Sequence, residues 1–341
     1  MKSFLNETND TIALKNVYDH IQDEESRNIY MARSMYSLSD NKNYMKDIVR
    51  KCDMSREIYN SIVGKNKLVL FGAGTWGEAI TYYLDDIHWD YVIDNKIQGN
   101  VVNGYKINKL DEIKQPNEYY YIVACMFKWR EIENQLIDRG IPSNNILILG
   151  KLVEEKQYFD LSYLKLGGGD EVFIDVGGYN GDTTQRFLEK TGNKYDSIYI
   201  LEPNKFLAAE CREKNSKYKN CYIIEKGAWN KCTKLRFNMA EAGSTISDSA
   251  NEIIETISID ELLGGKRASY IKMDIEGAEL QALLGAEQTI RKYKPKLAIS
   301  VYHNRYDIWD IPKLVLSYNN AYKLYFRTYS YTGNDTIMYA L

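Results

Sequence analysis

Two carboxylates and one histidine stand where predicted strands end, and together they could move a proton. Asp274 and Glu276 flank Ile275 at the end of an apolar strand, and His303 comes just after the next strand. Residues i and i+2 of an extended segment share a face, so both carboxylates should point toward one mouth. A histidine or aspartate beside a hydroxyl can take its proton as the oxygen attacks. We therefore predict Asp274, Glu276 and His303 as the catalytic residues, with a structural histidine as the alternative for His303.

The same three side chains could instead ligate a divalent metal ion. Their spacing alone does not define a Mg²⁺ or Mn²⁺ site, so we predict that no metal is bound. Glu279 lies one helical turn after Glu276 in the sequence. Glu279 should therefore share a face with Glu276, and the alternative is a helix N-terminal charge that complements the helix dipole.

A glycine turn lies upstream of these residues. Gly177, Gly178 and Gly181 follow a buried strand that carries Asp175 near its end, and Glu202 ends the next strand. Glycines let the backbone approach a ligand, and an acid at the next strand tip can accept hydrogen bonds from ribose hydroxyls. Asp175 could bind the turn amides or a cofactor ammonium, or could simply cap the following helix. The pattern predicts that these five residues bind an adenosine-containing cofactor.

The segments that position these residues alternate between strands and helices, as in a doubly wound sheet. The expected strands are 171–176, 198–202, 221–225, 270–274, 296–301, 322–327 and 335–340, with a hairpin near 232–237. The expected helices cover about 181–190, 204–215, 277–291 and 310–319. The alternation predicts an α/β sheet that ends in a hairpin.

Several motifs of this half, taken together, resemble a known enzyme family. They are Tyr270-Ile-Lys-Met-Asp-Ile-Glu-Gly-Ala-Glu, Ser300-Val-Tyr-His-Asn-Arg-Tyr-Asp and Asp335-Thr-Ile-Met-Tyr-Ala. The spacing Asp175-x-Gly177-x-x-x-Gly181 is similar to the first motif of S-adenosylmethionine-dependent methyltransferases. With it, residues 165–341 resemble the FkbM family of methyltransferases. The segment Phe326-Arg-Thr-Tyr departs from the Arg-His pair that the family frequently has there.

The resemblance implies a fold, a cofactor and a substrate class. It implies a seven-stranded class I methyltransferase sheet whose last strand inserts antiparallel, an S-adenosyl-L-methionine cofactor, and methyl transfer to hydroxyls of saccharides or glycosylated metabolites. It places the adenine beside Ala228 and Trp229, where Trp229 either stacks on the base or is a core aromatic. The stretch 244–248 matches a serine-rich segment of the family, or is a solvated loop.

A second glycine-rich turn lies far upstream. Gly72, Gly74 and Gly77 follow an apolar strand, and Asp94 ends the strand after it. Glycines at a helix N-terminus can bring backbone amides to a diphosphate, and Asp94 could bind ribose hydroxyls. This part of the chain resembles the nucleotide-sugar-binding domain that precedes some sugar acyltransferases. The resemblance implies a nucleotide-sugar at these four residues, and a scaffold without ligand is the alternative.

Two other functions stay open at this point. One is an NAD-dependent oxidoreductase built on the upstream glycine turn, although that region offers no catalytic Lys/Tyr or His/Asp pair. The other is a non-catalytic nucleotide-binding module. The cofactor that copurifies with the protein discriminates between them, because each function binds a different molecule.

The sequence divides into four parts. We predict a helical segment at 1–64, a small Rossmann-like domain at 65–150, a linker at 151–169 and a methyltransferase domain at 170–341. The linker is placed by a charged stretch followed by three glycines. The predicted fold class is therefore α/β, with two Rossmann-like doubly wound sheets and an N-terminal helical segment.

Composition narrows the function further. The net charge is −3, the pI is about 5.8 and no basic block is present, so the chain does not resemble a nucleic-acid-binding protein. No apolar run approaches the ~18–20 residues of a membrane span, and the opening residues do not resemble a signal peptide. Five scattered cysteines without a C-x-x-C pair indicate reduced thiols. We predict a cytoplasmic carbohydrate-modifying enzyme and leave a homo-oligomer open.

Overall fold

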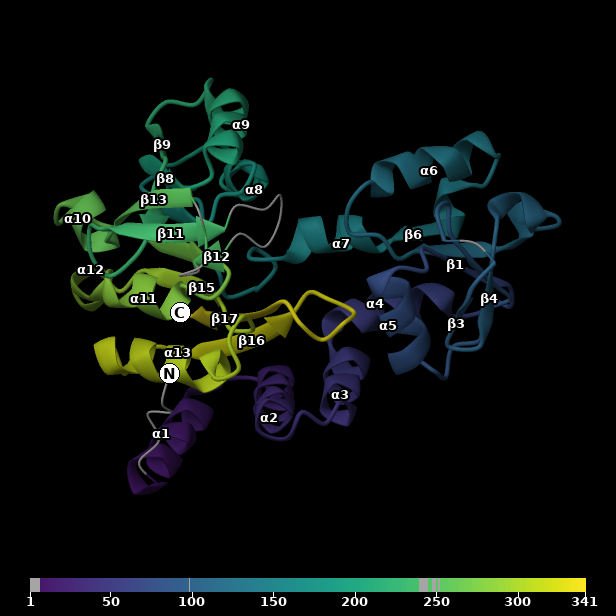
Figure 1. Cartoon of the computed structure of the whole chain (residues 1–341), viewed down its shortest axis with the longest axis horizontal. Helices are drawn as coiled ribbons and strands as arrows, with labels where there is room; N and C mark the ends of the chain where they lie inside the picture. Colours follow the sequence, from purple (N-terminus) through teal and green to yellow (C-terminus); the bar gives the residue numbers. More distant parts are fainter. Residues whose placement is uncertain (1–6, 98, 239–244, 247–249, 251) are drawn as a thin grey trace. The chain divides into compact units, whose positions relative to one another are not determined.

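The computed structural model describes residues 7–97, 99–238, 245–246, 250 and 252–341 (Figure 1). The chain forms two compact units, and neither is continuous in sequence. The seven-stranded unit comprises Met1–Tyr30, Tyr158–Phe326 and Ile337–Leu341, and the six-stranded unit comprises Met31–Gln157 and Arg327–Thr336. The expected boundaries assigned the start of the chain to a separate helical segment and 327–336 to the methyltransferase domain. In the structure the start of the chain belongs to the seven-stranded unit, and 327–336 belongs to the six-stranded unit.

The main sheet of the seven-stranded unit has the order β16-β17-β15-β14-β7-β8-β9. Its strands are β7 (Val172–Val176), β8 (Ser197–Leu201), β9 (Cys221–Ile224), β14 (Tyr270–Met273), β15 (Lys296–Ser300), β16 (Leu324–Thr328) and β17 (Thr336–Ala340). The strands from β15 through β14, β7 and β8 to β9 are parallel, and β17 pairs antiparallel with β15. The predicted methyltransferase sheet with its antiparallel last strand is confirmed.

Burial explains why these segments are strands. All five residues of β7 and all four of β14 are buried, as expected for parallel strands that helices cover on both faces. The helices of the unit are α1 (Glu7–His20), α8 (Asp182–Lys190), α9 (Lys205–Asn215), α10 (Ile259–Leu263), α11 (Glu279–Leu284), α12 (Glu287–Tyr293) and α13 (Asp307–Tyr318). Helix α13 packs against α1 and α11, so the first helix of the chain joins the C-terminal half.

The expected single helix at 277–291 is two helices, α11 and α12, separated at Gly285. The carbonyl of Gly285 accepts a hydrogen bond from the Asp260 N–H at 2.9 Å instead of serving a continuing helix. A Cβ at Gly285 would also overlap the carbonyl oxygen of Trp229. The break is therefore a packing requirement of the neighbouring loop, which the helical pattern did not reveal.

A smaller sheet adjoins the adenine side expected from the sequence. Its order is β10-β13-β11-β12, with β10 (Gly227–Ala228), β11 (Lys234–Asn238), β12 (Thr245–Ile246) and β13 (Glu252–Ile257). Strand β11 pairs antiparallel with both β12 and β13. The expected hairpin near 232–237 is part of this sheet, whereas most of the serine-rich stretch 244–248 lies outside the described residues.

The six-stranded unit has the sheet order β3-β4-β2-β1-β5-β6. Its strands are β1 (Leu68–Phe71), β2 (Tyr91–Ile93), β3 (Val101–Val102), β4 (Tyr105–Asn108), β5 (Tyr120–Val123) and β6 (Ile146–Ile148), and its longer helices are α3 (Asn43–Lys51), α4 (Asp53–Ile62), α5 (Thr75–Tyr83), α6 (Trp129–Asp138) and α7 (Leu149–Lys156). Strand β1 is parallel to both β2 and β5. Helix α2 (Glu24–Ser39) crosses the boundary between the two units in sequence.

The segment expected as a linker, 151–169, is packed structure. Its first residues continue α7, and its later part buries Tyr158, Phe159, Leu161 and Leu164 in the seven-stranded unit. The three glycines that suggested a flexible connection lie at the end of this segment, directly before β7. The burial of aromatic and aliphatic side chains in the rest of this segment therefore makes it part of the fold, although its glycines suggested a flexible linker.

Candidate active site

The glycine turn after β7 touches the end of the neighbouring strand β14. Gly177 has a φ of 78°, and a Cβ there would overlap the carbonyl oxygen of Asp274. The N–H groups of Gly177 and Gly178 both donate to the Leu201 carbonyl, at 2.9 and 3.1 Å. These two amides are thus engaged within the protein, and the glycines serve by bringing the two strand ends into contact.

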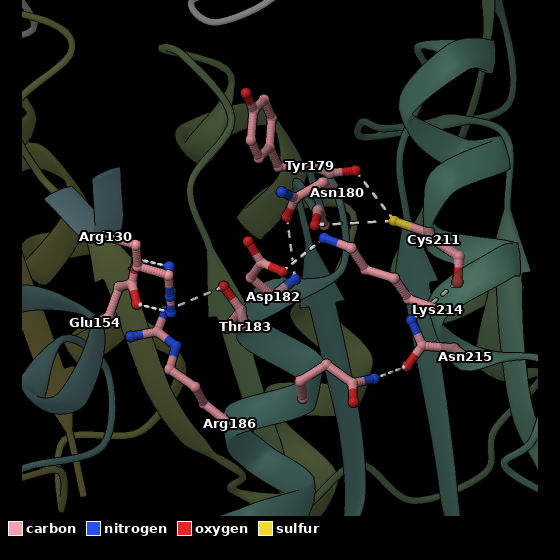
Figure 2. Close-up of polar contacts among 12 residues, drawn as sticks. Arg130, Glu154, Tyr179, Asn180, Asp182, Thr183, Arg186, Cys211, Lys214 and Asn215 are labelled. Atoms are coloured by element: carbon pink, nitrogen blue, oxygen red, sulfur yellow. Dashed lines mark hydrogen bonds and ion pairs between the residues drawn. The ribbon is translucent and has the colours of Figure 1, made fainter. Parts of the chain in front are cut away.

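Helix α9 holds the far side of the turn (Figure 2). The Cys211 thiol donates to the Tyr179 carbonyl at 3.0 Å, and Lys214 pairs with Asp182 at 2.7 Å. Gly181 has a φ of 86° and begins α8, and a Cβ there would crowd the Asn215 side chain. Gly181 therefore has a packing role in this structure, and its predicted contact with a cofactor stays a prediction.

Asp175 is buried beneath the turn instead of facing its open side. Its Oδ1 lies 3.1 Å from Lys272 Nζ, and its Oδ2 accepts a hydrogen bond from Thr184 Oγ1 at 2.9 Å. Lys272 Nζ also donates to the Gly177 carbonyl at 2.5 Å. Gly181, rather than Asp175, occupies the N-cap position of α8, and the predicted contact of Asp175 with a cofactor stays a prediction. Asp175 supports the turn through Lys272.

Glu202 bridges the two loops that border the expected ribose position. Its Oε2 accepts from the Tyr179 N–H at 3.0 Å, and its Oε1 accepts from the Asn204 N–H at 2.9 Å. Burial raises the pKa of Glu202 to about 7, although both N–H groups and the Lys272 charge act in the opposite direction. Each carboxylate oxygen keeps a second lone pair, so ribose hydroxyls could still donate to it.

Ala228 ends β10, at an edge of the smaller sheet, and Trp229 follows it. Ala228 is buried in β10, and the Trp229 N–H donates to the Ile257 carbonyl at 3.0 Å. Trp229 is half-buried. Both alternatives for this ring, stacking on adenine or core packing, stay open.

Asp274 receives donors on both carboxylate oxygens. Tyr158 Oη donates to Oδ2 at 2.7 Å, and Ser300 Oγ donates to Oδ1 at 2.8 Å. Tyr302 Oη and His303 Nε2 lie farther from Oδ1, at 3.4 and 3.5 Å. The predicted proximity of Asp274 to His303 is thus present, together with two tyrosines and a serine.

The charges around Asp274 determine its protonation. Burial by itself would raise the pKa of Asp274, but the Lys272 and His303 charges and the hydroxyl donors hold that pKa below its ordinary value. Asp274 is therefore a carboxylate at neutral pH. A strongly ionised carboxylate is a weak proton acceptor, so its geometry suits orientation better than proton removal.

His303 lies among three carboxylates and is almost completely buried. Its Nδ1 is 2.8 Å from Glu279 Oε1, and its Nε2 is 3.5 Å from both Asp274 Oδ1 and Glu276 Oε2. Burial lowers the pKa of His303, but the Glu279 contact and the other two carboxylates outweigh burial and raise it to about 9. At neutral pH the ring is an imidazolium, so proton removal by His303 requires its neutral form.

Glu279 is a site residue that the sequence reasoning missed. It is fully buried, faces His303, and accepts a hydrogen bond from the Ile275 N–H at 2.8 Å. Glu279 is also the first residue of α11, as expected for a helix N-terminal charge, but its side chain is buried against His303. The available signal was its place in the string Glu276-Gly-Ala-Glu279, three residues after the predicted catalytic acid.

Glu276 is the most open carboxylate of this group. Its side chain is 40% exposed, and its backbone has a φ of 55°, in the left-handed region that residues other than glycine rarely adopt. Such a conformation costs about 1–3 kcal/mol and is found most often at functional sites. It turns Glu276 back toward His303 rather than letting strand β14 continue.

The group has the spacing of a metal site. One ligand atom each from Asp274, Glu279 and His303 lies within 4.8 Å of the others, and no other such group occurs among the residues that the structure describes. Both nitrogens of His303 face carboxylates, so the imidazolium itself supplies a positive charge to this cluster.

The upstream turn is built differently. Asp94 accepts hydrogen bonds from three backbone N–H groups, those of Ala73, Lys96 and Ile97, at 2.9, 2.7 and 2.9 Å. A Cβ at Gly77 would overlap the Gly72 carbonyl, whereas a Cβ at Gly74 would meet nothing within 4 Å. Gly77 is thus needed for packing, and open space remains beside Gly74.

Comparison with known proteins identifies the C-terminal part. Residues 175–331 match the model of the methyltransferase FkbM domain. The crystal structure of an FkbM methyltransferase from Methylobacillus flagellatus KT is 17% identical, covers 92% of this chain and 98% of its own, and has a TM-score of 0.51. No curated protein matches the sequence. The chain therefore carries an FkbM methyltransferase domain and is an S-adenosyl-L-methionine-dependent methyltransferase.

More distant structures share only part of the chain. Fibrillarin from Aeropyrum pernix, solved with natively bound S-adenosyl-L-methionine, is 12% identical, covers 56% of this chain and 74% of its own, and has a TM-score of 0.36. A methyltransferase from Aquifex aeolicus is 16% identical, covers 51% and 84%, and has a TM-score of 0.30. Within the described residues, no helix is both long and apolar enough to cross a membrane.

Proposed function

We propose that this enzyme transfers a methyl group to a hydroxyl of a saccharide or glycosylated metabolite. The observation that carries the proposal is the contact between the glycine turn and the acidic cluster, because Gly177 abuts Asp274 directly. A methyl donor held at the turn would therefore lie beside Asp274, Glu276 and His303. Carboxylates and an imidazole are suitable partners for the hydroxyls of a sugar, which both donate and accept hydrogen bonds.

The residues around the turn fit S-adenosyl-L-methionine. When bound, this cofactor supplies a methyl group on a positively charged sulfur. We assign Glu202 to the ribose, Gly177, Gly178 and Gly181 to the turn beside the cofactor, Ala228 and Trp229 to the adenine, and Asp175 to indirect support. The excess negative charge of Asp274, Glu276 and Glu279 over His303 complements a sulfonium.

On the acceptor side, the proposed roles follow from charge and exposure. Asp274 and Glu276 accept hydrogen bonds from sugar hydroxyls and orient the attacking oxygen. Neutral His303 takes the proton, and Glu279 positions its ring through Nδ1. Because His303 is mostly protonated at neutral pH, this mechanism requires activity to increase toward alkaline pH.

The same arrangement leads us to propose a metal-independent reaction. The imidazolium lies between Glu279 and Asp274, where a cation would otherwise balance their charges. Activity should be unchanged after treatment with EDTA and passage into metal-free buffer. Loss of activity that Mg²⁺ or Mn²⁺ restores would show that His303 shares this site with a metal.

The direct test of the function is methyl transfer itself. The purified full-length protein is incubated with S-adenosyl-L-methionine labelled in the methyl group and a panel of mono- and oligosaccharides, and the product is analysed by mass spectrometry. We expect label on a sugar oxygen. Small molecules that copurify are measured in parallel: S-adenosylhomocysteine agrees with the proposal, whereas NAD(P) would favour the oxidoreductase, which the comparisons do not support. Label on nitrogen or carbon would contradict O-methylation.

For the six-stranded unit, we propose a choice between a nucleotide-sugar site and a scaffold. The open space beside Gly74 favours a ligand, whereas the three amides on Asp94 leave that carboxylate little capacity for ribose. A thermal-shift panel of UDP-, GDP- and dTDP-sugars on the full chain, with Gly74→Val as control, decides between them. A ligand at a hundred times its Kd adds about 2.7 kcal/mol of stability. No shift, or an equal shift in Gly74→Val, supports the scaffold.

We place the reaction in the cytoplasm on the basis of composition. All five cysteines are free thiols, which suits a reducing compartment. Fractionation of cells that produce the protein from its own gene would test this placement.

A further inference from the structure

Tyr158 belongs to the segment that the sequence predicted as a linker, yet its phenol lies in the active-site cluster. Its Oη donates to Asp274 Oδ2 at 2.7 Å. Only 2% of the residue is exposed, so the hydroxyl makes this contact away from bulk water. The hydrogen bond joins a residue before β7 to the residue after β14, 116 positions apart.

The backbone of Tyr158 is held from two sides. Its N–H donates to Tyr339 Oη at 3.0 Å, and its carbonyl accepts from Tyr270 Oη at 2.7 Å. Its φ is 71°, in the left-handed region, so the chain keeps an unfavourable conformation here. Two hydrogen bonds to two other residues therefore fix the point from which the ring projects.

The ring of Tyr158 also lies near two cations. Lys272 Nζ is 5.4 Å from the ring centroid, and the Arg186 guanidinium carbon is 5.9 Å from it. Both distances are within the range of cation–π attraction. The ring therefore cannot rotate away from Asp274 without losing these contacts as well.

We infer that Tyr158 is a positioning residue of the methyl-transfer reaction, which acts by fixing the carboxylate of Asp274. The inference rests on the proposed role of Asp274. Tyr158 binds Oδ2 while Ser300 binds Oδ1 from strand β15, so the carboxylate is held from opposite sides. Hydrogen bonds to an ionised carboxylate are the strong kind, and a group locked in this way keeps its orientation when the acceptor arrives.

The other groups around Asp274 do not replace this contact. The charges of Lys272 and His303 act on the pKa of Asp274, and the hydroxyls of Tyr158, Ser300 and Tyr302 lie against its carboxylate. Tyr302 Oη is 3.4 Å away and its ring packs on His303, with centroids 4.1 Å apart. Among the described residues, Tyr158 thus provides the shortest hydrogen bond to Asp274, and it does so on Oδ2, whereas Ser300 and Tyr302 contact Oδ1.

Tyr158→Phe removes the hydroxyl and keeps the ring. We expect kcat to decrease about 10–100-fold, the size of effect that follows from a misplaced catalytic group. The Kd of S-adenosyl-L-methionine should change less than twofold. The rise of kcat/KM toward pH 9 reports the titration of His303, so its midpoint should stay close to that of the wild type.

The matched control is Tyr339→Phe, which removes another buried hydroxyl that contacts Tyr158 but does not touch Asp274. It should lower stability and leave kcat close to the wild-type value. In an Asp274→Asn background, Tyr158→Phe should have little further effect on kcat, because both changes act on one carboxylate. Unchanged kcat in Tyr158→Phe, additive losses, or equal losses in both tyrosine variants would overturn the inference.

A second readout does not depend on catalysis. The ¹³C signal of the Asp274 carboxyl, assigned by its absence in Asp274→Asn, should titrate at higher pH in Tyr158→Phe than in the wild type. Replacement of Tyr158 by 3-fluorotyrosine, a stronger donor, should move the titration to lower pH and serves if Tyr158→Phe does not fold. No movement in either variant contradicts the inference. Movement without any saccharide methylation would contradict the proposed acceptor instead and leave the contact established.

Discussion

The glycine turns after β1 and after β7 can be compared atom by atom. The Gly72 N–H donates to the Ile93 carbonyl at 2.8 Å, and the Gly177 N–H donates to the Leu201 carbonyl at 2.9 Å. In each unit the acid that follows that carbonyl accepts from an amide of the turn: Asp94 from Ala73 and Glu202 from Tyr179. The two turns thus share one backbone plan.

The difference lies in the residue that ends the next strand. A Cβ at Gly72 would meet the carbonyl of Ala124, and a Cβ at Gly177 would meet the carbonyl of Asp274. Ala124 follows β5 as Asp274 follows β14, and both strands pair in parallel with the strand before the turn. The equivalent position is therefore Ala124 in the six-stranded unit and the carboxylate of Asp274 in the seven-stranded unit. In both units the glycine turn brings the ends of two neighbouring strands into contact. The side chain at the end of the second strand then determines whether a reactive group is present there.

The strongest test of this comparison replaces the reactive side chains beside the glycine turn of the seven-stranded unit. Asp274→Asn and His303→Ala should each lower kcat by about 10²–10⁴-fold, the usual cost of losing a general base or its partner. The affinity for S-adenosyl-L-methionine should stay close to that of the wild type, because these groups act on the acceptor. Single-turnover kinetics and calorimetry measure the two quantities separately. Wild-type turnover in both variants would remove them from the catalytic set.

The next test concerns support beneath the turn. Lys272→Met leaves the buried Asp175 carboxylate without its cation, and removal of one partner from a buried pair costs about 3–5 kcal/mol. We expect a decrease of that size in the free energy of unfolding, measured by urea titration. The double variant Lys272→Met/Asp175→Leu should recover part of the loss. Equal stability of the single variant and the wild type would show that the pair is not needed.

Two substitutions, Glu202→Gln and Asp94→Asn, compare the acids that follow the second strand of each unit. Glu202→Gln should weaken S-adenosyl-L-methionine binding by about 1.5–3 kcal/mol, the range for hydrogen bonds to a charged group. Asp94→Asn, the equivalent change in the six-stranded unit, should leave that affinity unchanged. Calorimetry on both variants checks the pair. If both lose affinity equally, the division of roles between the two turns is wrong.

The smallest expected effect is the change in kcat/KM for each unit of pH. The pKa of His303 is raised to about 9, so kcat/KM should increase about tenfold per pH unit up to that value and then level off. The raised pKa also stabilises the fold: this contribution is complete below the ordinary value of 6.5 and is lost as pH rises through about 9. Rates and urea midpoints between pH 6 and 10 measure both. A rate plateau that begins below pH 7 would identify a carboxylate as the base.

The strands that carry the site could be predicted because their residues are continuously apolar. The run before Asp175, the run before Asp274 and the glycines between them give the sheet and its open edge, and family motifs add the order of the strands. The short hairpin of β3 and β4 was missed because Val101–Asn108 alternates weakly and contains many polar residues. Gly285 was missed because its constraint is a contact with a distant loop.

The composition of the active site was less predictable than the fold. Asp274, Glu276 and His303 were found from their positions after strands, and the structure brings them together. Glu279 and Tyr158 were not predicted as site residues, since Glu279 was assigned to a helix N-terminus and Tyr158 to a linker. The inward orientation of Asp175 depends on Lys272 in the neighbouring strand, and such pairing across strands cannot be read from one sequence alone.

In each unit, a segment near the start of the chain forms a hydrogen bond with a segment near its end. Within the seven-stranded unit the Phe326 N–H donates to Ser26 Oγ at 2.8 Å, and within the six-stranded unit Arg33 Nη1 donates to the Gly333 carbonyl at 3.0 Å, each across 300 residues. During synthesis, therefore, neither unit can finish folding until almost the whole chain has left the ribosome. Strand β17, which pairs with β15, is also among the last residues to emerge. A chain that stops before it exposes an apolar strand edge, and we expect such truncated products to aggregate instead of persisting as partial enzymes.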